Sequence, residues 1–383
     1  MLDLKNKDAA QPAIETPAGR WSPQKALAWQ EHHGWLCGFN FMPSTAVNFI
    51  DMWHEETFDP QTIDQELAIA SATGFNSLRT NLQFVLWQDN RQSLHERIEK
   101  FLEIASRNNL KTVFCLFDDC GFSGASPSNE VQSPPVPGVH NSRAMASPGR
   151  DVVMDMAMRP ELEAYVKDII STYARDERVI LWDLYNEPGN LMIFRVDGQK
   201  EFSADLEPYS LSLLLDCFEW ARSVSPTQPI TTGGWHIPMP WEDGDDLYNH
   251  QIDQTAFSLS DVISFHAYCD AERMANIVRK LKSFSRPLLC TEWMARSIGS
   301  NIKEQLPLLE ECNVGAFQWG LVQGRSQTHI PWPQIFDVIE KYGKTAELQF
   351  HDLFDGNGRP FDETEVQVIG ELTSRRALDE RHA

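Results

Sequence analysis

The sequence predicts an α/β fold, and the number of its strands points to a closed parallel barrel. Eight short runs of bulky apolar residues alternate with segments whose apolar residues recur at helical spacing. Eight is also the number of strands that closes a (β/α)8, or TIM, barrel. The predicted strands cover residues 35–41, 75–82, 111–117, 180–187, 229–236, 261–268, 288–292 and 315–322.

The helices between these strands have recognisable starts and stops. Pro60 follows Asp59, which is typical of a first helical turn, and Gly74 marks the end of the same helix. Ile63 and Leu67 share one face of it. Further helical segments are predicted over residues 94–105, 159–173, 208–224, 271–284 and 302–309.

Three segments lie outside this alternation. Residues 120–158 contain five prolines with many Ser and Gly, and a loop of this length inside a domain is usually functional or disordered. Because it follows a strand, we predict that it forms a rim or lid over a site. Residues 1–34 are predicted to be an N-terminal extension, residues 35–330 the single barrel domain, and residues 331–383 a turn-rich extension packed on the barrel.

The overall charge argues against two classes of partner. The chain of 383 residues carries a formal net charge of −22. Nucleic acids and anionic membranes both select for basic surfaces, so neither is predicted as a partner. The seven cysteines are odd in number and scattered, which indicates free thiols in a reducing compartment. No run reaches transmembrane length and the first residues lack the apolar core of a signal peptide, so a cytoplasmic location is predicted.

Two of the predicted strands end on a glutamate. One run closes on Asn186-Glu187, and Pro188 and Gly189 stop the strand directly afterwards. The run from residue 288 onward is apolar and has Glu292 at its tip. In a parallel barrel the carboxyl ends of all strands meet at one face, where the active sites of this architecture lie. The sequence therefore predicts that two carboxylates, remote along the chain, meet at that face.

Other polar and aromatic residues also follow predicted strands. Flat aromatic faces among them suit the C–H faces of sugars, and the polar groups suit hydroxyl groups. The candidates for substrate binding are Arg79, Asp118, Asp119, Asn186, Trp235, His236, His266, Tyr268 and Trp319, with His140 and Asn141 in the long loop. The chain has no CxxC and no HExxH motif, so neither a metal nor another cofactor is predicted.

Together these residues resemble the retaining glycoside hydrolases of clan A, and most closely the cellulase-like family five. The resemblance spans roughly residues 35–325. It implies a TIM barrel that cleaves β-glycosidic bonds of oligosaccharides by double displacement. The motifs that carry it, each on the matching strand, are Arg79, Asn186-Glu187-Pro188, His266-Ala267-Tyr268, Glu292-Trp293 and Trp319.

The resemblance implies roles for the paired carboxylates. Glu187 would be the general acid/base and Glu292 the nucleophile, with carboxyl groups about 5–5.5 Å apart. Arg79 and a hydrogen bond from Tyr268 would keep Glu292 ionised, whereas partial burial and the charge of Glu292 would raise the pKa of Glu187. The remaining implied contacts are a hydrogen bond to the sugar 2-hydroxyl, a second hydrogen bond and a stacking floor, from Asn186, His266 and Trp319 respectively.

One segment departs from the family pattern and leaves the substrate open. Cellulases of this family usually carry a His-bearing motif after the third strand, where this chain has Leu116-Phe-Asp-Asp-Cys120. We predict an exo-acting β-glycosidase on short oligosaccharides, because a cytoplasmic location implies imported substrates. An endo-β-glycanase of cellulase, xylanase or mannanase type and a catalytically silent sugar-binding barrel are the alternatives.

Overall fold

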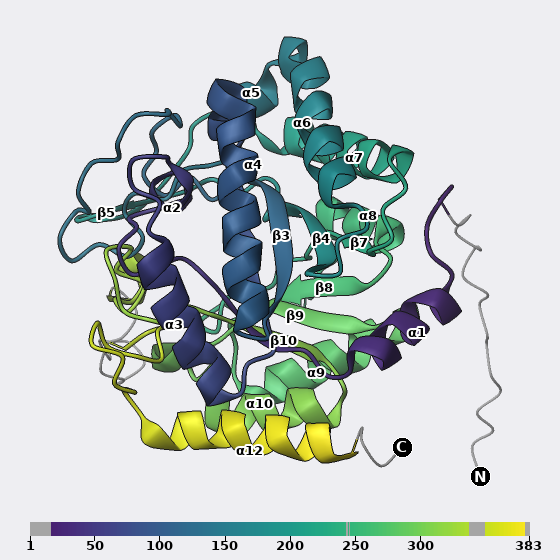
Figure 1. The fold of residues 1–383 in the computed structure, drawn as a ribbon, viewed down its shortest axis with the longest axis vertical. Coiled ribbons are helices and arrows are strands. Elements are labelled where there is room, and N and C mark those ends of the chain that lie inside the picture. The colour runs from purple at the N-terminus through teal and green to yellow at the C-terminus, as the bar shows by residue number, and fades with distance from the viewer. Residues whose placement is uncertain (1–16, 243, 245, 337–348, 380–383) are drawn as a thin grey trace.

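The two edges of the parallel sheet meet, so the barrel is closed. The computed structural model describes residues 17–242, 244, 246–336 and 349–379, and its eight barrel strands follow the order β7-β4-β3-β2-β1-β10-β9-β8 (Figure 1). A parallel bridge between Gly234 and Phe265 joins the chain after β7 to β8. The predicted (β/α)8 barrel is thereby confirmed. Its strands are β1 (Cys37–Asn40), β2 (Ser77–Asn81), β3 (Lys111–Asp118), β4 (Val179–Asn186), β7 (Ile230–Thr231), β8 (Ile263–His266), β9 (Leu288–Glu292) and β10 (Gly315–Trp319).

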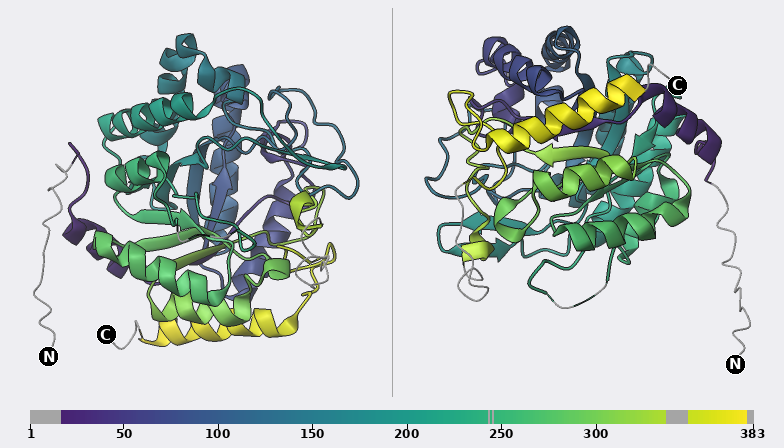
Figure 2. Two further views of the ribbon diagram at one scale, coloured as in Figure 1. Left: turned by 180° about the vertical axis from the view of Figure 1, so that it is seen from behind. Right: turned by 90° about the horizontal axis from the view of Figure 1, so that it is seen from below.

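Helices surround the barrel, and a small hairpin lies outside it (Figures 1 and 2). The hairpin consists of β5 (Met192–Arg195) and β6 (Gly198–Glu201) and follows β4. The α-helices with described bounds are α1 (Pro23–His33), α2 (Phe49–Trp53), α3 (Pro60–Thr73), α4 (Phe84–Arg107), α5 (Arg150–Met154), α6 (Arg159–Tyr173), α7 (Glu207–Ser223), α8 (Gln251–Leu259), α9 (Ala271–Leu281), α10 (Ile302–Glu311) and α12 (Glu363–Asp379).

The predicted limits of α3 are those of the structure. The Asp59 side chain accepts a hydrogen bond from the backbone N–H of Thr62, which satisfies one of the free donors of the first turn. Pro60 occupies the start of the helix, and Gly74 ends it with a left-handed φ of 110°.

The predicted strand over residues 229–236 is wrong in length. Only Ile230 and Thr231 pair with β4. At Gly234 an added Cβ would lie 2.3 Å from the ring of Phe257, so the missing side chain lets α8 pack directly on the chain at the barrel seam. Trp235 and the residues that follow it leave the sheet and enter a loop. Five further strands end earlier than predicted, at Asn40, Asn81, Asn186, His266 and Trp319.

The described part of the N-terminal segment covers the amino ends of the strands. Trp21 and Trp29, on or beside α1, belong to one buried cluster with Ile180 and Leu289, which lie near the starts of β4 and β9. The sequence did not predict this helix. In Figure 1 α1 lies on the right, away from the loops with α2 and β5 on the left. Residues 1–16 lie outside the described ranges.

The C-terminal segment packs on the outside of the barrel. Helix α12 lies across α10, and both Arg375 and Arg376 form ion pairs with Glu310 of α10 (Figure 1). Residues 337–348 and 380–383 of the predicted extension lie outside the described ranges. Among the described residues, no helix combines the length and apolar character that crossing a bilayer requires.

The barrel interior leaves no room beside Gly38, and this gives a test of the packing. An added Cβ would lie 2.6 Å from the ring of Phe317 and 2.7 Å from the hydroxyl of Ser77. We expect Gly38→Ala to lower the free energy of unfolding by about 1–3 kcal/mol in urea titrations, because the core is overpacked. Gly356→Ala is the matched control, since its nearest atom would lie at an ordinary 3.6 Å. Equal effects of the two changes would contradict this packing.

Candidate active site

A cavity of about 550 Å³ opens at the carboxyl ends of the strands. It brings together both predicted catalytic residues and ten of the eleven predicted binding residues, although these come from the ends of six strands, the loop after β7 and the long loop. The predicted residues that line it are Arg79, Asp118, His140, Asn141, Asn186, Glu187, Trp235, His236, His266, Tyr268, Glu292 and Trp319. Asp119 is the exception.

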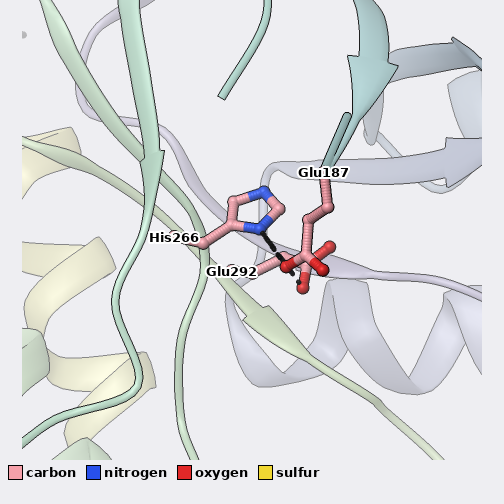
Figure 3. A group of neighbouring side chains, drawn as sticks. All are labelled: Glu187, His266 and Glu292. Atoms are coloured by element: carbon pink, nitrogen blue, oxygen red, sulfur yellow. Dashed lines mark hydrogen bonds and ion pairs between the residues drawn. The ribbon is translucent and has the colours of Figure 1, made fainter. Parts of the chain in front are cut away.

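Glu187 and Glu292 lie close together, and the ring of His266 lies against both carboxyl groups. Nδ1 of His266 donates a hydrogen bond of 2.8 Å to Oε1 of Glu187 and lies 3.6 Å from Oε2 of Glu292. One ring nitrogen of His266 and one carboxylate oxygen of each glutamate all lie within 4.8 Å of one another. Figure 3 shows the imidazole pointing toward both carboxyl groups from its own strand. All three side chains are buried.

Arg79 fixes the position of Glu292 from inside the barrel. Its guanidinium donates to Oε1 of Glu292 at 3.0 Å and, through Nε, to Asp183 at 2.9 Å. The same group donates to the side-chain oxygens of Asn40 at 2.8 Å and Asn186 at 2.7 Å. Burial acts to lower the pKa of Arg79, but the charges of Asp183 and Glu292 outweigh it and raise the pKa. The guanidinium is therefore a permanent cation beneath the site.

Glu187 is held by contacts that the sequence did not predict. Its Oε2 accepts hydrogen bonds from Nδ2 of Asn190 at 2.7 Å and from the thiol of Cys120 at 3.0 Å. The backbone of Glu187 has a φ of 43°, in the left-handed region that non-glycine residues rarely adopt. Cys120 follows β3 directly, so its place at a strand end was the available signal. Asn190 lies beyond the Pro188-Gly189 turn and gave none.

The pKa shifts of the two glutamates run opposite to the predicted directions. Burial acts to raise the pKa of Glu187, but the hydrogen bond and charge of His266 outweigh it and lower the pKa. Burial raises the pKa of Glu292, although His266 and Arg79 oppose the shift. The prediction differed because it did not include a contact of His266 with either carboxylate, whereas Nδ1 of His266 lies 2.8 Å from Glu187 and 3.6 Å from Glu292. The two carboxylates in turn raise the pKa of His266 against the effect of its burial.

The two aspartates after β3 lie in different environments. Asp118 lines the cavity, accepts hydrogen bonds from Asn81 and Asn186, and has its pKa raised by burial to about 7. Asp119 is fully buried beneath the cavity. Its carboxylate accepts hydrogen bonds from Tyr185 at 2.8 Å and from the backbone N–H of Gly189 at 2.7 Å. Asp119 thus anchors the turn after Glu187, and its predicted contact with substrate is wrong.

The loop after β7 forms the mouth of the cavity on the side of Glu187. Trp235 donates its indole N–H to the backbone oxygen of Pro188 at 3.2 Å. His236 bonds to Asp253 at 2.9 Å, and its ring stacks on His250 with a centroid distance of 3.8 Å. These partners leave His236 at the rim with its position fixed by α8.

The long loop after β3 joins the segment after β10 and bridges the mouth. The side chain of Gln327 donates to the backbone oxygens of Val136 and Val139 at 2.7 and 3.0 Å. Nδ1 of His140 donates to the oxygen of Ile330 at 2.6 Å, and the backbone N–H of Asn141 donates to Ser326 at 2.9 Å. We call residues 136–141 together with 326–330 the bridge. Its two arms follow β3 and β10, which β2 and β1 separate in the sheet.

Several cavity residues come from segments that gave no sequence signal. Phe122 and Phe194 stack with a centroid distance of 4.3 Å and connect the long loop to the β5–β6 hairpin. Trp332 and His351 belong to the predicted C-terminal extension, yet both line the cavity. No strand of the barrel ends next to these residues, so position along the chain could not identify them.

The same three side chains form a group of the kind that can bind a metal ion. Among the described residues, Glu187, His266 and Glu292 are the one group of three His, Cys, Asp or Glu side chains compact enough for a metal ion. Their oxygens are engaged by Arg79, Tyr268 and Asn190 at hydrogen-bond distances of 2.7–3.0 Å. Such contacts suit carboxylates that exchange protons, and we assign no metal here.

Comparison with known proteins identifies the fold. No family model and no curated protein matches the chain. The exo-β-1,4-mannosidase Op5Man5 from Opitutaceae bacterium strain TAV5 is 17% identical, with a TM-score of 0.56 over 89% of this chain and 60% of that chain. The endo-1,4-β-mannanase from Rhizomucor miehei is 13% identical, with a TM-score of 0.57 over 90% of this chain and 95% of that chain. GH5_18 from Streptomyces cattleya, as a variant in complex with Manβ1-4GlcNAc, is 14% identical, with a TM-score of 0.58 over 89% of this chain and 81% of that chain. The chain shares the barrel of these proteins.

The contacts of His266 with two carboxylates predict a pH-dependent stability. Because its pKa is raised from 6.5, the imidazolium stabilises the fold below pH 6.5, and this contribution is lost as the pH rises through the folded value. The pKa of Glu187 is lowered from 4.5, so its contribution is present above pH 4.5. We expect the difference in unfolding free energy between wild type and His266→Asn to be largest near about pH 5.5 and smaller near about pH 9 in urea titrations.

His33 offers a control of opposite sign. Burial lowers its pKa to about 4, so protonation destabilises the folded state. The wild type should therefore gain stability relative to His33→Asn as the pH rises through the same range. A His266→Asn difference that does not change with pH would contradict the proposed position of its charge.

Proposed function

We propose that the protein is a retaining β-glycosidase that removes sugars from the non-reducing ends of oligosaccharides. The observation that carries the proposal is the pair of buried strand-end glutamates, with oxygens within 4.8 Å of each other and a cation beneath one of them. Retaining hydrolases need two carboxyl groups about 5–5.5 Å apart, whereas inverting enzymes need about 6.5–9.5 Å to admit a water. The separation here therefore favours retention.

Glu292 is proposed as the nucleophile. Its carboxylate attacks the anomeric carbon while the bond to the leaving oxygen breaks, which forms a glycosyl ester. Arg79 and the hydroxyl of Tyr268, at 3.0 and 2.9 Å, each hold one of its oxygens. These two contacts fix the direction of attack and favour the charged form of the carboxylate that the first step requires.

Glu187 is proposed as the general acid and then the general base. It gives a proton to the leaving oxygen in the first step and removes a proton from water in the second, when water attacks the ester and Glu292 departs. The proton of this site is shared with Nδ1 of His266 across their 2.8 Å hydrogen bond. When the ester has formed, the proton has departed with the leaving group and the charge of Glu292 is gone, so Glu187 is ionised and can accept a proton from water.

The side chains around the pair supply the proposed contacts to the sugar. Asn186 is fixed on both sides, since its oxygen accepts from Arg79 and its Nδ2 donates to Asp118 at 2.9 Å. The other hydrogen on Nδ2 makes only a weak contact with Sγ of Cys120 at 3.4 Å, and a sugar 2-hydroxyl can replace that contact with one that strengthens in the transition state. Trp319 offers its partly exposed ring as the floor for the sugar bound over Glu292.

The bridge supports the exo mode. Its arms follow the strands on either side of β1 and β2, and one arm follows Trp319 at the end of β10, so we expect it to wall the side where the sugar ahead of the scissile bond would extend. The opposite side, toward the loop after β7, adjoins Glu187, which protonates the leaving group. A chain end therefore fits the cavity better than the middle of a polymer. A cytoplasmic location, as predicted above, would suit an enzyme that trims imported oligosaccharides.

Terminal β-mannosides are the first substrates that we propose to test. An exo-β-1,4-mannosidase shares the fold, and GH5_18 from Streptomyces cattleya carries Manβ1-4GlcNAc in its complex. β-Glucosides and β-xylosides complete the panel, because the segment after β3 differs from the cellulase pattern.

Azide rescue tests the roles of the two glutamates. With 2,4-dinitrophenyl β-glycosides, Glu292→Ala should be inactive, and azide should restore turnover with an α-glycosyl azide as product. Glu187→Ala should form the ester, and azide should release it as a β-glycosyl azide. For poor leaving groups we expect Glu187→Gln to lose about 10²–10⁴-fold in kcat/KM.

Glu66→Gln is the matched control, since Glu66 is another buried glutamate and does not line the cavity. Its activity should equal that of wild type. Wild type that binds sugars without turnover would instead favour the silent sugar-binding barrel.

A product assay tests the direction of action. With a reducing-end-labelled oligosaccharide, the wild type should release monosaccharide and leave a ladder that shortens by one sugar at a time. The first monosaccharide seen by NMR should have the β configuration, because retention preserves the anomer. Early appearance of internal fragments would show an endo-enzyme.

A further inference from the structure

Two histidines from distant parts of the chain meet at the wall of the cavity. His140 lies in the long loop after β3, and His351 lies in the segment that follows β10. Their rings are 5.2 Å apart at 73°, and both rings line the same cavity as Glu187 and Glu292. Both residues are more than nine-tenths buried, with exposures of 3% and 1%. We call them the histidine pair.

Hydrogen bonds to the backbone fix the tautomer of each ring. Nδ1 of His140 bonds to the carbonyl oxygen of Ile330 at 2.6 Å, and Nδ1 of His351 bonds to that of Met294 at 2.6 Å. A carbonyl oxygen can only accept, so each Nδ1 carries the hydrogen and each Nε2 carries a lone pair. Within the ranges that the structure describes, neither Nε2 has a hydrogen-bond partner of its own.

Both rings keep this neutral form. Burial lowers the pKa of His140 to about 4. Burial and the neighbouring His140 lower the pKa of His351 well below its ordinary value. The pair therefore offers two uncharged acceptors, and an uncharged acceptor selects for a hydrogen-bond donor such as a hydroxyl group.

The ring of Tyr268 connects the histidine pair to the proposed nucleophile, Glu292. Tyr268 donates to Glu292 at 2.9 Å, and its own ring lies 5.5 Å from that of His351. The ring of His351 stacks on Trp319 at 6.2 Å and 20°, so it continues the proposed sugar floor. His140 belongs to the bridge. The acceptors are thus on the walled side of the cavity, where the terminal sugar would stand.

We propose that the Nε2 atoms of His140 and His351 accept hydrogen bonds from hydroxyl groups of the terminal sugar, so that the site recognises an unsubstituted non-reducing end of a neutral pyranoside. This inference rests on the proposed function. It adds that the walled side of the site binds hydroxyl groups of the terminal sugar. Sugars that are acylated, methylated or extended at these hydroxyls lack the required hydrogen and are excluded.

Substrate and protein changes can be combined to test the pair. The probes are 4-nitrophenyl β-mannosides, or the β-glycosides that wild type cleaves fastest, with deoxygenation at C3, C4 or C6 in turn. Wild type should lose at least about fivefold in kcat/KM at one or two of these positions, as expected for lost neutral hydrogen bonds. The 2-hydroxyl is left unchanged because other residues are assigned to it.

Matched variants distinguish the loss of the Nε2 acceptor from damage to the folded structure. In His140→Asn and His351→Asn the amide can still donate to the backbone carbonyl, but the acceptor at the Nε2 position is gone. In the Gln variants an amide oxygen can occupy that position. Wild type should lose kcat/KM when a specific hydroxyl is removed from the substrate; we call this loss the deoxy penalty. We expect it to vanish in the Asn variant and to persist in the Gln variant. His33→Asn, on α1 at the other end of the barrel, should leave every penalty unchanged.

The outcomes distinguish this inference from the proposed function. Active wild type whose deoxy penalties are unchanged in both Asn variants would refute the pair and leave the hydrolase intact. If wild type cleaves no glycoside, the same deoxy series is measured as methyl glycosides by titration calorimetry; the same coupling in Kd supports the pair, and its absence overturns it. If an Asn variant does not fold, O-methyl glycosides decide with wild type: efficient cleavage of all of them refutes the pair.

Discussion

The buried guanidinium of Arg79 is the interaction on which the arrangement of this site depends. It is 1% exposed and is surrounded by two carboxylates and two amide oxygens, from residues on β1, β4 and β9. A buried cation of this kind is tolerated only when its donors are paired, because an uncompensated charge would cost several kcal/mol. The requirement works in both directions. Pairing Arg79 fixes Glu292 and Asn186, and the folded barrel must bring those strands into register for the cation to be buried at all.

A second constraint comes from the loops, which turn an open barrel mouth into a cavity. The strand ends alone supply the carboxylates, the amide and the stacking surface. The walled side is built from the long loop and the segment after β10, which are joined by backbone and side-chain hydrogen bonds through Gln327, His140 and Asn141. Among the described residues, every hydrogen bond that joins the two arms of the bridge has a backbone group at one end or both, so the join depends on chain path more than on side-chain identity. In the proposed function, chemistry belongs to the barrel and selection of the chain end belongs to the bridge.

The site is built from strand ends and from loops, and most of what the sequence could predict lies at the strand ends. Glu187 and Glu292 were recognisable because a strand end has a local signature and the barrel carries all such ends to one face. Asp119 has the same signature as Asp118, but alternate residues of an extended chain point to opposite sides, and only packing decides which side is the cavity. Asn190, Trp332 and His351 reach the site through turns and long connections that have no periodic pattern. The position of the His266 ring against both carboxylates depends on side-chain packing that no local pattern encodes.

That position changes how the proposed acid should be understood. A carboxyl group that acts alone must hold its proton through burial and repulsion from its neighbour, which was the expectation for Glu187. Here an imidazole competes for the same proton across 2.8 Å, so the pKa of Glu187 is lowered while that of His266 is raised. Strongly interacting groups titrate as a unit, and the proton belongs to the pair rather than to either residue. A sugar oxygen that approaches Glu187 needs only to draw that proton across an existing hydrogen bond. Its supply depends on the charge of Glu292, because the ionised nucleophile is what keeps His266 protonated. Proton donation and nucleophilic attack are thereby tied to the same ionisation state of the site.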